Sequence, residues 1–390
     1  MRMRAPNMVP RHHNLVWLDL LKAVAMMWIF LNHFVERIFG FPEIANPTNA
    51  WLPLEERISQ LLPLSGNGIL DIPINLLRYV GWFGDQGVQL FLIASGFGIT
   101  FGLLRQGAPS LDVTRFYWRR FERILPMWWV AHIVLVPILL FAGSIRPTDI
   151  NILFSFFGVR ILSEQLYFLE GSWWYIGLLL QLYLVYPLLW HVLHTLGPGK
   201  FMVIMTMLAF VVRGVGLAYF DDYLDAWSRG AIFITRLPEF VFGMVLAWGF
   251  HTVPVKASGI LKKPGTIILA LVIYILGMLL SLTLWGMTVA VFMLGIGAFG
   301  LLFLPLTAWS TSPSKTLNLV VWIGTHSYSI FLVHGLCIRL FVPPGGSILS
   351  STVWFGCAAA ILTTAVGSYG LEKVTDYLIK TVKLVRRSGG

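Results

Sequence analysis

Charged residues are scarce in this sequence. Asp, Glu, Lys and Arg together make up 12% of the 390 residues, whereas hydrophobic residues make up 57%. A typical soluble protein is about 25% charged, and a soluble chain this apolar would expose large apolar patches and aggregate. The composition therefore excludes an ordinary soluble globular protein. The 16 Trp, 12 Tyr and 28 Phe residues favour a bilayer protein, because aromatic side chains collect at membrane interfaces.

Cysteine and secretory signals are also nearly absent. Cys337 and Cys357 both lie in apolar stretches and give neither metal-ligand spacing nor a disulfide framework. We therefore expect inert buried thiols and no metal site. We also expect no cleavable signal peptide, because the first apolar stretch contains Asp19, Lys22 and His33, which are too polar for the core of such a signal.

Long apolar runs fill most of the chain. Crossing the hydrocarbon takes about 20 mostly apolar residues, and we count about ten such runs. They lie near 15–38, 80–104, 122–143, 173–195, 200–219, 231–250, 265–284, 286–306, 319–341 and 352–372. The sequence predicts an all-α polytopic membrane protein with about ten transmembrane helices.

The basic residues predict the orientation of this bundle. The net charge of +10 does not indicate a nucleic-acid partner, because the basic residues form short clusters between apolar segments. Lys and Arg favour cytoplasmic loops. With both termini cytoplasmic, 18 basic residues lie on the cytoplasmic side and 7 on the other. We therefore expect a multi-pass protein of a cell membrane, and we favour the bacterial cytoplasmic membrane.

This topology divides the chain into three parts. A cytoplasmic tail, 1–14, precedes the membrane domain, 15–372, and a basic cytoplasmic tail, 373–390, follows it. Two long external loops are expected at about 39–79 and 144–172. Within the second, 150–168 reads either as loop or as a re-entrant or surface helix.

The first apolar run carries an unusual set of ionisable groups. Asp19, Lys22 and His33 lie inside it, and ionisable groups within a bilayer are costly enough to be functional candidates by default. Lys22 and His33 are eleven residues apart. In a helix they share one face to within about 20° and lie about 16 Å apart along the axis. Lys22 also has Asp19 three residues earlier, so a local ion pair is the alternative to a functional role.

Six motifs in a fixed order resemble the acyltransferase 3 family of membrane acyltransferases. The first is the acidic and basic pair followed by His33. The others are Gly87-Val88-Gln89-Leu90-Phe91 through Ser95-Gly96-Phe97, Phe116 through Pro126, Trp174 through Pro187, Arg236 through Gly243, and Gly324 followed by Ser327 through His334. Glu372 also lies where the last helix of the family often carries Glu.

The resemblance implies acyl transfer across the membrane. The donor is commonly cytoplasmic acyl-CoA, a co-substrate, with no bound cofactor, and acetyl is the expected acyl group. The acceptor is often a hydroxyl of a cell-surface glycan or a lipid-linked glycan. His33 takes the role of catalytic base or acyl relay. Lys22 departs from the family, which usually has Arg there, and Leu179 departs from one subgroup that has Glu; Glu170 or Glu239 is a possible substitute.

Arg120 and Arg123 form the candidate donor site. They are three residues apart and share a helix face, and guanidinium groups match the geometry of the CoA phosphates. The alternative is simple anchoring at the cytoplasmic interface. Ser95 either presents a hydroxyl to the substrate path or serves close helix packing.

The remaining candidates lie further along the chain. Ser327 and His334 are two turns apart on one face, and His334 reads as a second catalytic or acceptor-orienting histidine or as a helix-packing group. Arg236 and Glu239 read as a structural pair or as the rim of the acceptor site.

Two other classes of protein share the predicted architecture. A transporter or flippase for a polysaccharide or lipid-linked precursor would also have ten helices and buried charges, but it would move substrate without consuming acyl-CoA. A structural or sensor protein would tolerate the loss of His33, Arg120 and Arg123.

Overall fold

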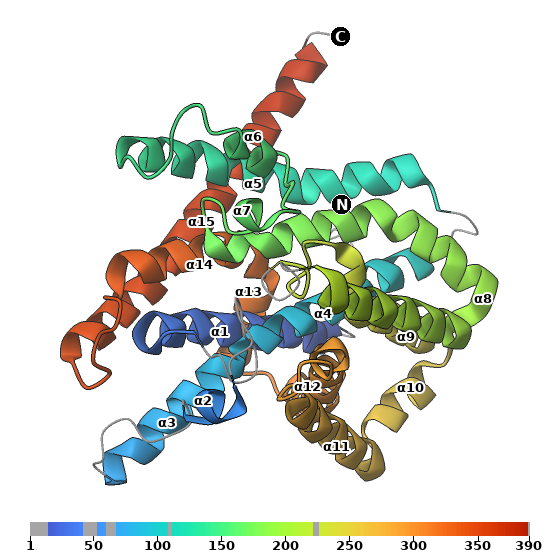
Figure 1. Cartoon of the computed structure of the whole chain (residues 1–390). Coiled ribbons are helices and arrows are strands. Elements are labelled where there is room, and N and C mark those ends of the chain that lie inside the picture. Colours follow the sequence, from blue (N-terminus) through green and yellow to red (C-terminus); the bar gives the residue numbers. More distant parts are fainter. Residues whose placement is uncertain (1–14, 42–52, 60–67, 108–110, 221–225, 389–390) are drawn as a thin grey trace, which may run out of the picture.

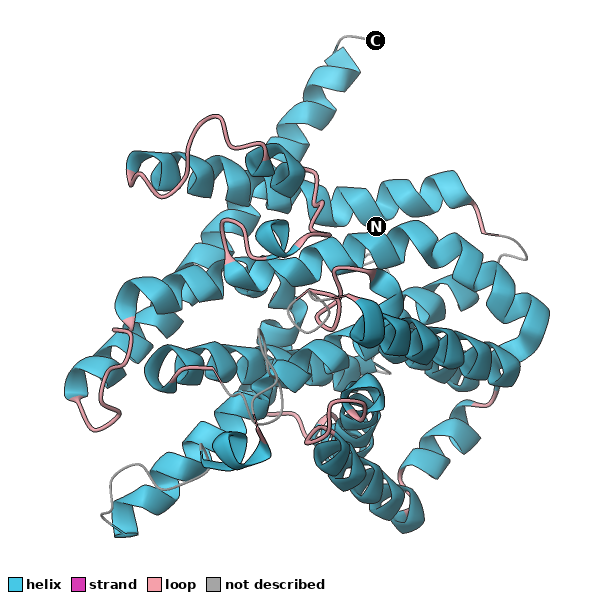
Figure 2. Cartoon of the chain, viewed as in Figure 1, coloured by secondary structure: helices cyan, strands magenta, loops and turns pink. Residues whose placement is uncertain are grey.

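The computed structural model describes residues 15–41, 53–59, 68–107, 111–220 and 226–388. Within these ranges it contains helices and loops and no strand (Figure 2), which confirms the all-α prediction. The helices are α1 (Val16–Phe39), α2 (Leu54–Ser59), α3 (Gly68–Trp82), α4 (Gly87–Leu104), α5 (Val113–Phe141), α6 (Asn151–Phe156), α7 (Ser163–Leu166), α8 (Trp174–Tyr219), α9 (Leu237–Thr252), α10 (Pro254–Leu261), α11 (Pro264–Leu280), α12 (Met287–Trp309), α13 (Lys315–Thr325), α14 (Ser327–Phe341) and α15 (Ser351–Ser388). Short 3-10 turns precede three of them, at Phe83–Gln86, Gly171–Trp173 and Phe233–Arg236.

Seven helices in the described ranges are long and apolar enough to cross a membrane, or up to nine if each of two bent pairs is one span. The bent pairs are α10 with α11, at 59°, and α13 with α14, at 82°. Helix α8 has 46 residues and is interrupted at Gly197, with φ 75° and ψ 164°. That break lies between the predicted runs at 173–195 and 200–219. The protein is a multi-pass membrane protein, and the total of ten spans stays a prediction.

Two segments expected to be loops contain helices. Helix α3 lies in the predicted loop 39–79, where Asp71, Pro73 and Arg78 interrupt the apolar pattern. Two short helices, α6 and α7, lie within 150–168, in agreement with the helical alternative for that segment. At the other end of the chain, α15 continues through 373 to Ser388, so the described part of the predicted tail extends the last helix.

The apolar surface of the outer helices fits a lipid environment. Helix α11 buries only Ala270 and Gly277, while Ile268, Leu269 and Leu279 are among its exposed side chains. Such a surface would aggregate in water, so it agrees with lipid covering this helix. The inner helix α1 is different, because Leu20, Ala23 and Ala25 are fully buried.

Two glycines allow α4 and α9 to pack closely against each other. A Cβ atom at Gly96 of α4 would collide with the carbonyl oxygen of Phe240 on α9. A Cβ atom at Gly243 of α9 would collide with the carbonyl oxygen of Ile93 on α4. These small residues let the two backbones meet, as is common between membrane helices. The packing role expected of the Ser95-Gly96 step is therefore observed at Gly96.

Segments predicted to share one side of the membrane gather at one edge of the bundle. The start of α5, the bend of α8 and helix α10 all lie toward the right edge in Figure 1, whereas α3 and the end of α14 lie toward the left edge. The right-hand segments carry Arg115, Lys200 and Lys256. This arrangement agrees with the charge pattern, and the compartment that each edge faces stays a prediction.

Candidate active site

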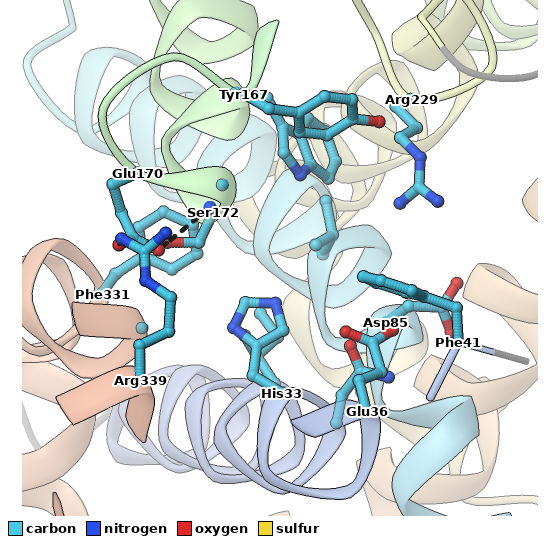
Figure 3. A pocket seen from close by; sticks show the side chains of 16 residues that line it. His33, Glu36, Phe41, Asp85, Tyr167, Glu170, Ser172, Arg229, Phe331 and Arg339 are labelled. Atoms are coloured by element: carbon cyan, nitrogen blue, oxygen red, sulfur yellow. Dashed lines mark hydrogen bonds and ion pairs between the residues drawn. The ribbon is translucent and has the colours of Figure 1, made fainter. Parts of the chain in front are cut away.

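Two histidines from distant parts of the chain meet between α1 and α14. His33 Nδ1 lies 3.0 Å from His334 Nε2, and the two ring planes differ by 10°. His334 is completely buried. His33 projects from α1 into a cavity, as the close view shows (Figure 3). The structure therefore joins the two histidines that the sequence singled out separately.

Hydrogen bonds fix which nitrogen of each neutral ring carries the proton. His334 Nδ1 lies 2.8 Å from the carbonyl oxygen of Phe331. A carbonyl oxygen only accepts, so Nδ1 of His334 donates, and its Nε2 is left as an acceptor. Nδ1 of His33 then donates to that Nε2. The Nε2 lone pair of His33 is therefore free to accept a proton from the cavity, which is the form required of a general base.

Polar contacts at the ends of α1 and α14 hold this pair in register. Arg37, one turn beyond His33, donates to the carbonyl oxygens of Val342 at 3.0 Å and Arg339 at 3.2 Å. These carbonyls lie at the carboxyl end of α14, where a cation is favoured. Asn32 donates to backbone carbonyls at the end of α3 rather than to His33. The rotation of α1 is thereby set from two sides.

His33 lines a cavity of about 460 Å³ that we call the histidine cavity. Its walls come from α1, α4, α14, the turn before α8 and the segment near Arg229, and they include aromatic side chains such as Tyr167 and Trp174. The ionisable side chains that line it are His33, Glu36, Asp85, Glu170, Arg229 and Arg339. Carboxylates, guanidiniums and aromatic rings around an imidazole suit a polar acceptor that carries hydroxyl groups.

Glu170 and Arg339 form an ion pair on one wall of this cavity (Figure 3). Ser172 donates to Glu170 Oε1 through its backbone N–H and its hydroxyl, at 3.4 and 3.3 Å. Gly335 makes room for the carboxylate, because a Cβ atom there would collide with Glu170 Oε1. Leu169 has a φ of 65°, a conformation that costs a residue with a side chain about 1–2 kcal/mol. This strained turn aims Glu170 at its partners.

Arg160 holds the loop that presents Glu170. Its guanidinium donates to the carbonyl oxygens of Leu166 at 2.8 Å and Phe168 at 2.9 Å, and to the hydroxyl of Ser155 at 2.7 Å. Burial lowers the pKa of Arg160 to about 9, with Glu170 opposing the shift, so the group stays charged at neutral pH. Burial raises the pKa of Glu170, and Arg339 offsets only part of that increase.

A second cavity, of about 310 Å³, lies further along the same helices, and we call it the basic cavity. Its cations are Lys22, Arg120 and Arg123. It is also lined by Ser95, Ser327 and three tyrosines, Tyr175, Tyr183 and Tyr328. Among the described residues that line it there is no carboxylate. Three cations around one cavity suit an anionic group such as a phosphate.

Four helices serve both cavities in sequence. Along α1, Lys22 faces the basic cavity and His33 the histidine cavity. Along α4, Val88 faces the histidine cavity and Ser95 the basic cavity, and α8 and α14 are shared in the same manner. Phe331 lines both. The two cavities therefore lie in succession through the bundle and meet at this residue.

Comparison with known proteins identifies the chain. The family model described as an acyltransferase domain, that of acyltransferase 3, matches residues 15–370. The chain belongs to the acyltransferase 3 family. This result confirms the resemblance and the predicted enzyme class. The chain is also similar to the peptidoglycan O-acetyltransferase OatA of Listeria monocytogenes, with 26% identity over 303 residues. The match covers 67% of this chain and 46% of that protein, so the chain spans about half the length of the curated relative. No solved structure matches it.

Most of the residues predicted for this acyltransferase line the two cavities. Lys22, Ser95, Arg120, Arg123 and Ser327 come together around the basic cavity. Lys22 Nζ also lies 2.6 Å from the carboxylate of Asp19, the local pair that was the alternative to a functional role. The two interpretations of Lys22 are compatible, because its side chain makes the pair and lines the cavity.

Arg236 and Glu239 occupy a different place in the acyltransferase. Glu239 is completely buried, with Oε1 3.3 Å from Arg213 Nη2 and 3.9 Å from Arg236 Nη1. Arg213 also donates to the carbonyl oxygens of Thr235 and Thr288, at 2.6 and 2.7 Å. None of these three charged residues lines either cavity. This placement favours the structural-pair interpretation.

Several residues of the histidine cavity were not among the candidates from the sequence. Glu36 lies one turn beyond His33 on the same helix face, so helical spacing alone was a usable signal. Asp85 and Arg229 lie in segments read as a helix start and an external loop, and nothing in their sequence context pointed to His33. Of the two carboxylates proposed to substitute at Leu179, Glu170 lines the histidine cavity and Glu239 does not.

Proposed function

We propose that this acyltransferase moves an acetyl group from cytoplasmic acetyl-CoA to a hydroxyl of a glycan on the far side of a bacterial cytoplasmic membrane. The observation that carries the proposal is the His33–His334 pair, with the Nε2 lone pair of His33 directed to the cavity. The acceptor class is supported by the similarity to a peptidoglycan O-acetyltransferase. A glycan attached to lipid meets the same chemical requirement.

In the proposed reaction, an acceptor hydroxyl in the histidine cavity donates a hydrogen bond to His33 Nε2. As the hydroxyl oxygen attacks the thioester carbonyl carbon, its proton passes to Nε2, and the new carbon–oxygen bond forms. The imidazolium of His33 keeps its Nδ1–H bond to His334. When the tetrahedral intermediate collapses, the carbon–sulfur bond breaks, CoA leaves, and His33 returns the proton to the sulfur.

The basic cavity supplies the donor site in this proposal. Arg120 and Arg123 lie one turn apart on α5, and guanidinium groups bind phosphate oxygens through paired hydrogen bonds. Lys22 adds a third positive charge on α1. The thioester of a donor bound there extends toward Phe331, where the two cavities meet. The basic edge of the bundle is then the cytoplasmic one, as the charge pattern predicts.

Membership in this family favours acyl transfer over transport. The histidine pair also supplies the general base that acyl transfer to a hydroxyl requires. A flippase would still move its lipid-linked precursor after the loss of His33 and would not consume acetyl-CoA.

The test compares His33→Ala with His191→Ala, an exposed histidine that lines neither cavity. Membranes from cells that produce each variant receive isotope-labelled acetyl-CoA, and acetyl esters on envelope glycans are measured by mass spectrometry. Removal of a general base lowers the rate by about 10²- to 10⁴-fold, while His191→Ala keeps the wild-type rate. Equal acetylation by His33→Ala and wild type, at equal protein levels, contradicts the proposal.

A further inference from the structure

One aromatic side chain forms the partition between the two cavities. Phe331 is the residue of α14 that lines both the histidine cavity and the basic cavity. Its side chain is only 4% exposed, so the ring is held by neighbours rather than lying loose in either cavity.

Two further rings complete the partition. The Phe331 ring centroid lies 5.3 Å from that of Tyr175 and 6.4 Å from that of Phe91, and those two rings are 6.0 Å apart. Phe331 meets both other rings edge to face, and such contacts at these distances are favourable. The three rings come from α14, α8 and α4, which are helices that serve both cavities, so the rings lie together where the cavities meet.

The partition lies beside the proposed base. The Phe331 ring centroid is 5.4 Å from that of His334, which is bonded to His33. A hydroxyl activated by His33 therefore meets a thioester from the basic cavity at the level of these rings. The acyl group bonded to the reacting carbon must occupy the space that the rings leave.

We propose that Phe331 determines which acyl group is transferred, by limiting the space at the partition to a short chain such as acetyl. This inference rests on the proposed function, because it concerns the donor of the same reaction. A longer chain, such as butyryl, would overlap the Phe331 ring. Loss of even one methylene of fit in a pocket changes selectivity by about 10- to 200-fold.

The Phe331 ring can be removed without changing the hydrogen bond that its backbone makes to His334. Its carbonyl oxygen accepts from His334 Nδ1, and every substitution at this position keeps that carbonyl. Phe331→Ala therefore removes the ring without removing the bond that orients the histidine pair. Phe331→Leu is a milder form that keeps an apolar side chain if Phe331→Ala folds poorly. Phe331→Tyr keeps the ring.

The matched control is Phe242→Ala. Phe242 is a partly buried aromatic residue of α9 that lines neither cavity. It loses the same number of atoms as Phe331→Ala, so it reports the general effect of an aromatic truncation in the bundle.

The experiment gives membranes with wild type or a variant an equimolar mixture of acetyl-CoA and butyryl-CoA, and mass spectrometry measures the two esters on envelope glycan. Affinities of both donors are measured on the purified full chain. We expect Phe331→Ala, and more weakly Phe331→Leu, to raise the butyryl-to-acetyl ratio by about 10-fold or more. Phe331→Tyr and Phe242→Ala keep the wild-type ratio.

The outcomes separate the two proposals. If the wild type transfers no acyl group, the proposed function fails, and the donor affinities still test the partition. If Phe331→Ala and Phe331→Leu both keep the wild-type preference between acetyl-CoA and butyryl-CoA in transfer or in affinity, that result overturns the proposed role of Phe331 in selecting the acyl group.

Discussion

In the histidine cavity the polar side chains mostly bind one another, whereas in the basic cavity like charges face the same space. His33 is bonded to His334, and Glu170 is paired with Arg339 and receives two bonds from Ser172. The basic cavity gathers Lys22 and two arginines, and Arg120 Nε has no hydrogen-bond partner. Lys22 is paired with Asp19, but no carboxylate among the described lining residues faces Arg120 and Arg123.

This difference suggests that the histidine cavity orients a catalytic base, whereas the basic cavity attracts an anionic substrate. A base must be held in one tautomer before the substrate arrives, because proton transfer depends on geometry. A site for phosphates gains from uncompensated positive charge, since the ligand supplies the missing anion. The two cavities therefore suit successive tasks, and substitutions in each should change different kinetic parameters.

The sharpest test of the orienting role is His334→Ala. It removes the acceptor for the His33 Nδ1–H, so the ring is no longer held with Nε2 toward the cavity. We expect kcat to fall by about 100-fold, with KM for acetyl-CoA unchanged. His334→Gln offers an oxygen acceptor and should recover at least part of the loss. His251→Ala, an exposed histidine, serves as the control. A similar loss in both His334 variants, without rescue, would indicate a structural role only.

The next largest effect is expected in the basic cavity. Arg120→Ala and Arg123→Ala each remove a guanidinium, and the loss of a hydrogen bond to a charged group is worth about 1.5–3 kcal/mol. We expect KM for acetyl-CoA to rise by about 10-fold or more in each, with kcat little changed. Arg115→Ala, an exposed residue one turn earlier than Arg119, provides the control.

Acetyl-dephospho-CoA makes this test specific for phosphate. The wild type should bind it more weakly than acetyl-CoA, and an arginine variant that has lost the contact should no longer distinguish the two. A fall in kcat with unchanged KM in both arginine variants would contradict the assignment of donor binding to the basic cavity and catalysis to the histidine cavity.

Helical periodicity made part of this site predictable. The spacing of Lys22 and His33 predicted one helix face leading from a cation to an imidazole, and the two residues line successive cavities. The i,i+3 spacing of Asp19 and Lys22 offered a local ion pair as the alternative to a functional role of Lys22, and the pair is present. Outside the site, the gap between the predicted runs 173–195 and 200–219 contains Gly197, where α8 is interrupted.

Contacts between distant segments were not predictable in this way. His33 and His334 are 301 residues apart, and Arg339 and Glu170 are 169 apart. Their meeting depends on how α1, α14 and the turn before α8 pack, which no local pattern encodes. His33 was a candidate because it is a costly polar group in an apolar run, and His334 because it ends a motif that resembles the family, but neither pattern paired the two histidines.

The smallest expected effect concerns the Glu170–Arg339 ion pair on the wall of the histidine cavity. Burial raises the pKa of Glu170 above its ordinary value of 4.5. The folded protein then holds this proton more tightly than the unfolded chain, so the free energy of unfolding falls as pH rises from 4.5 through the raised pKa. Glu170→Gln does not titrate and should flatten this slope, whereas Glu164→Gln, at an exposed site, should not. Thermal midpoints in detergent, which move by about 2–4 °C per kcal/mol, measure the slopes. Equal slopes in wild type and Glu170→Gln would show that Glu170 is solvated. The histidine cavity would then no longer differ from the basic cavity in having its charged side chains held by one another.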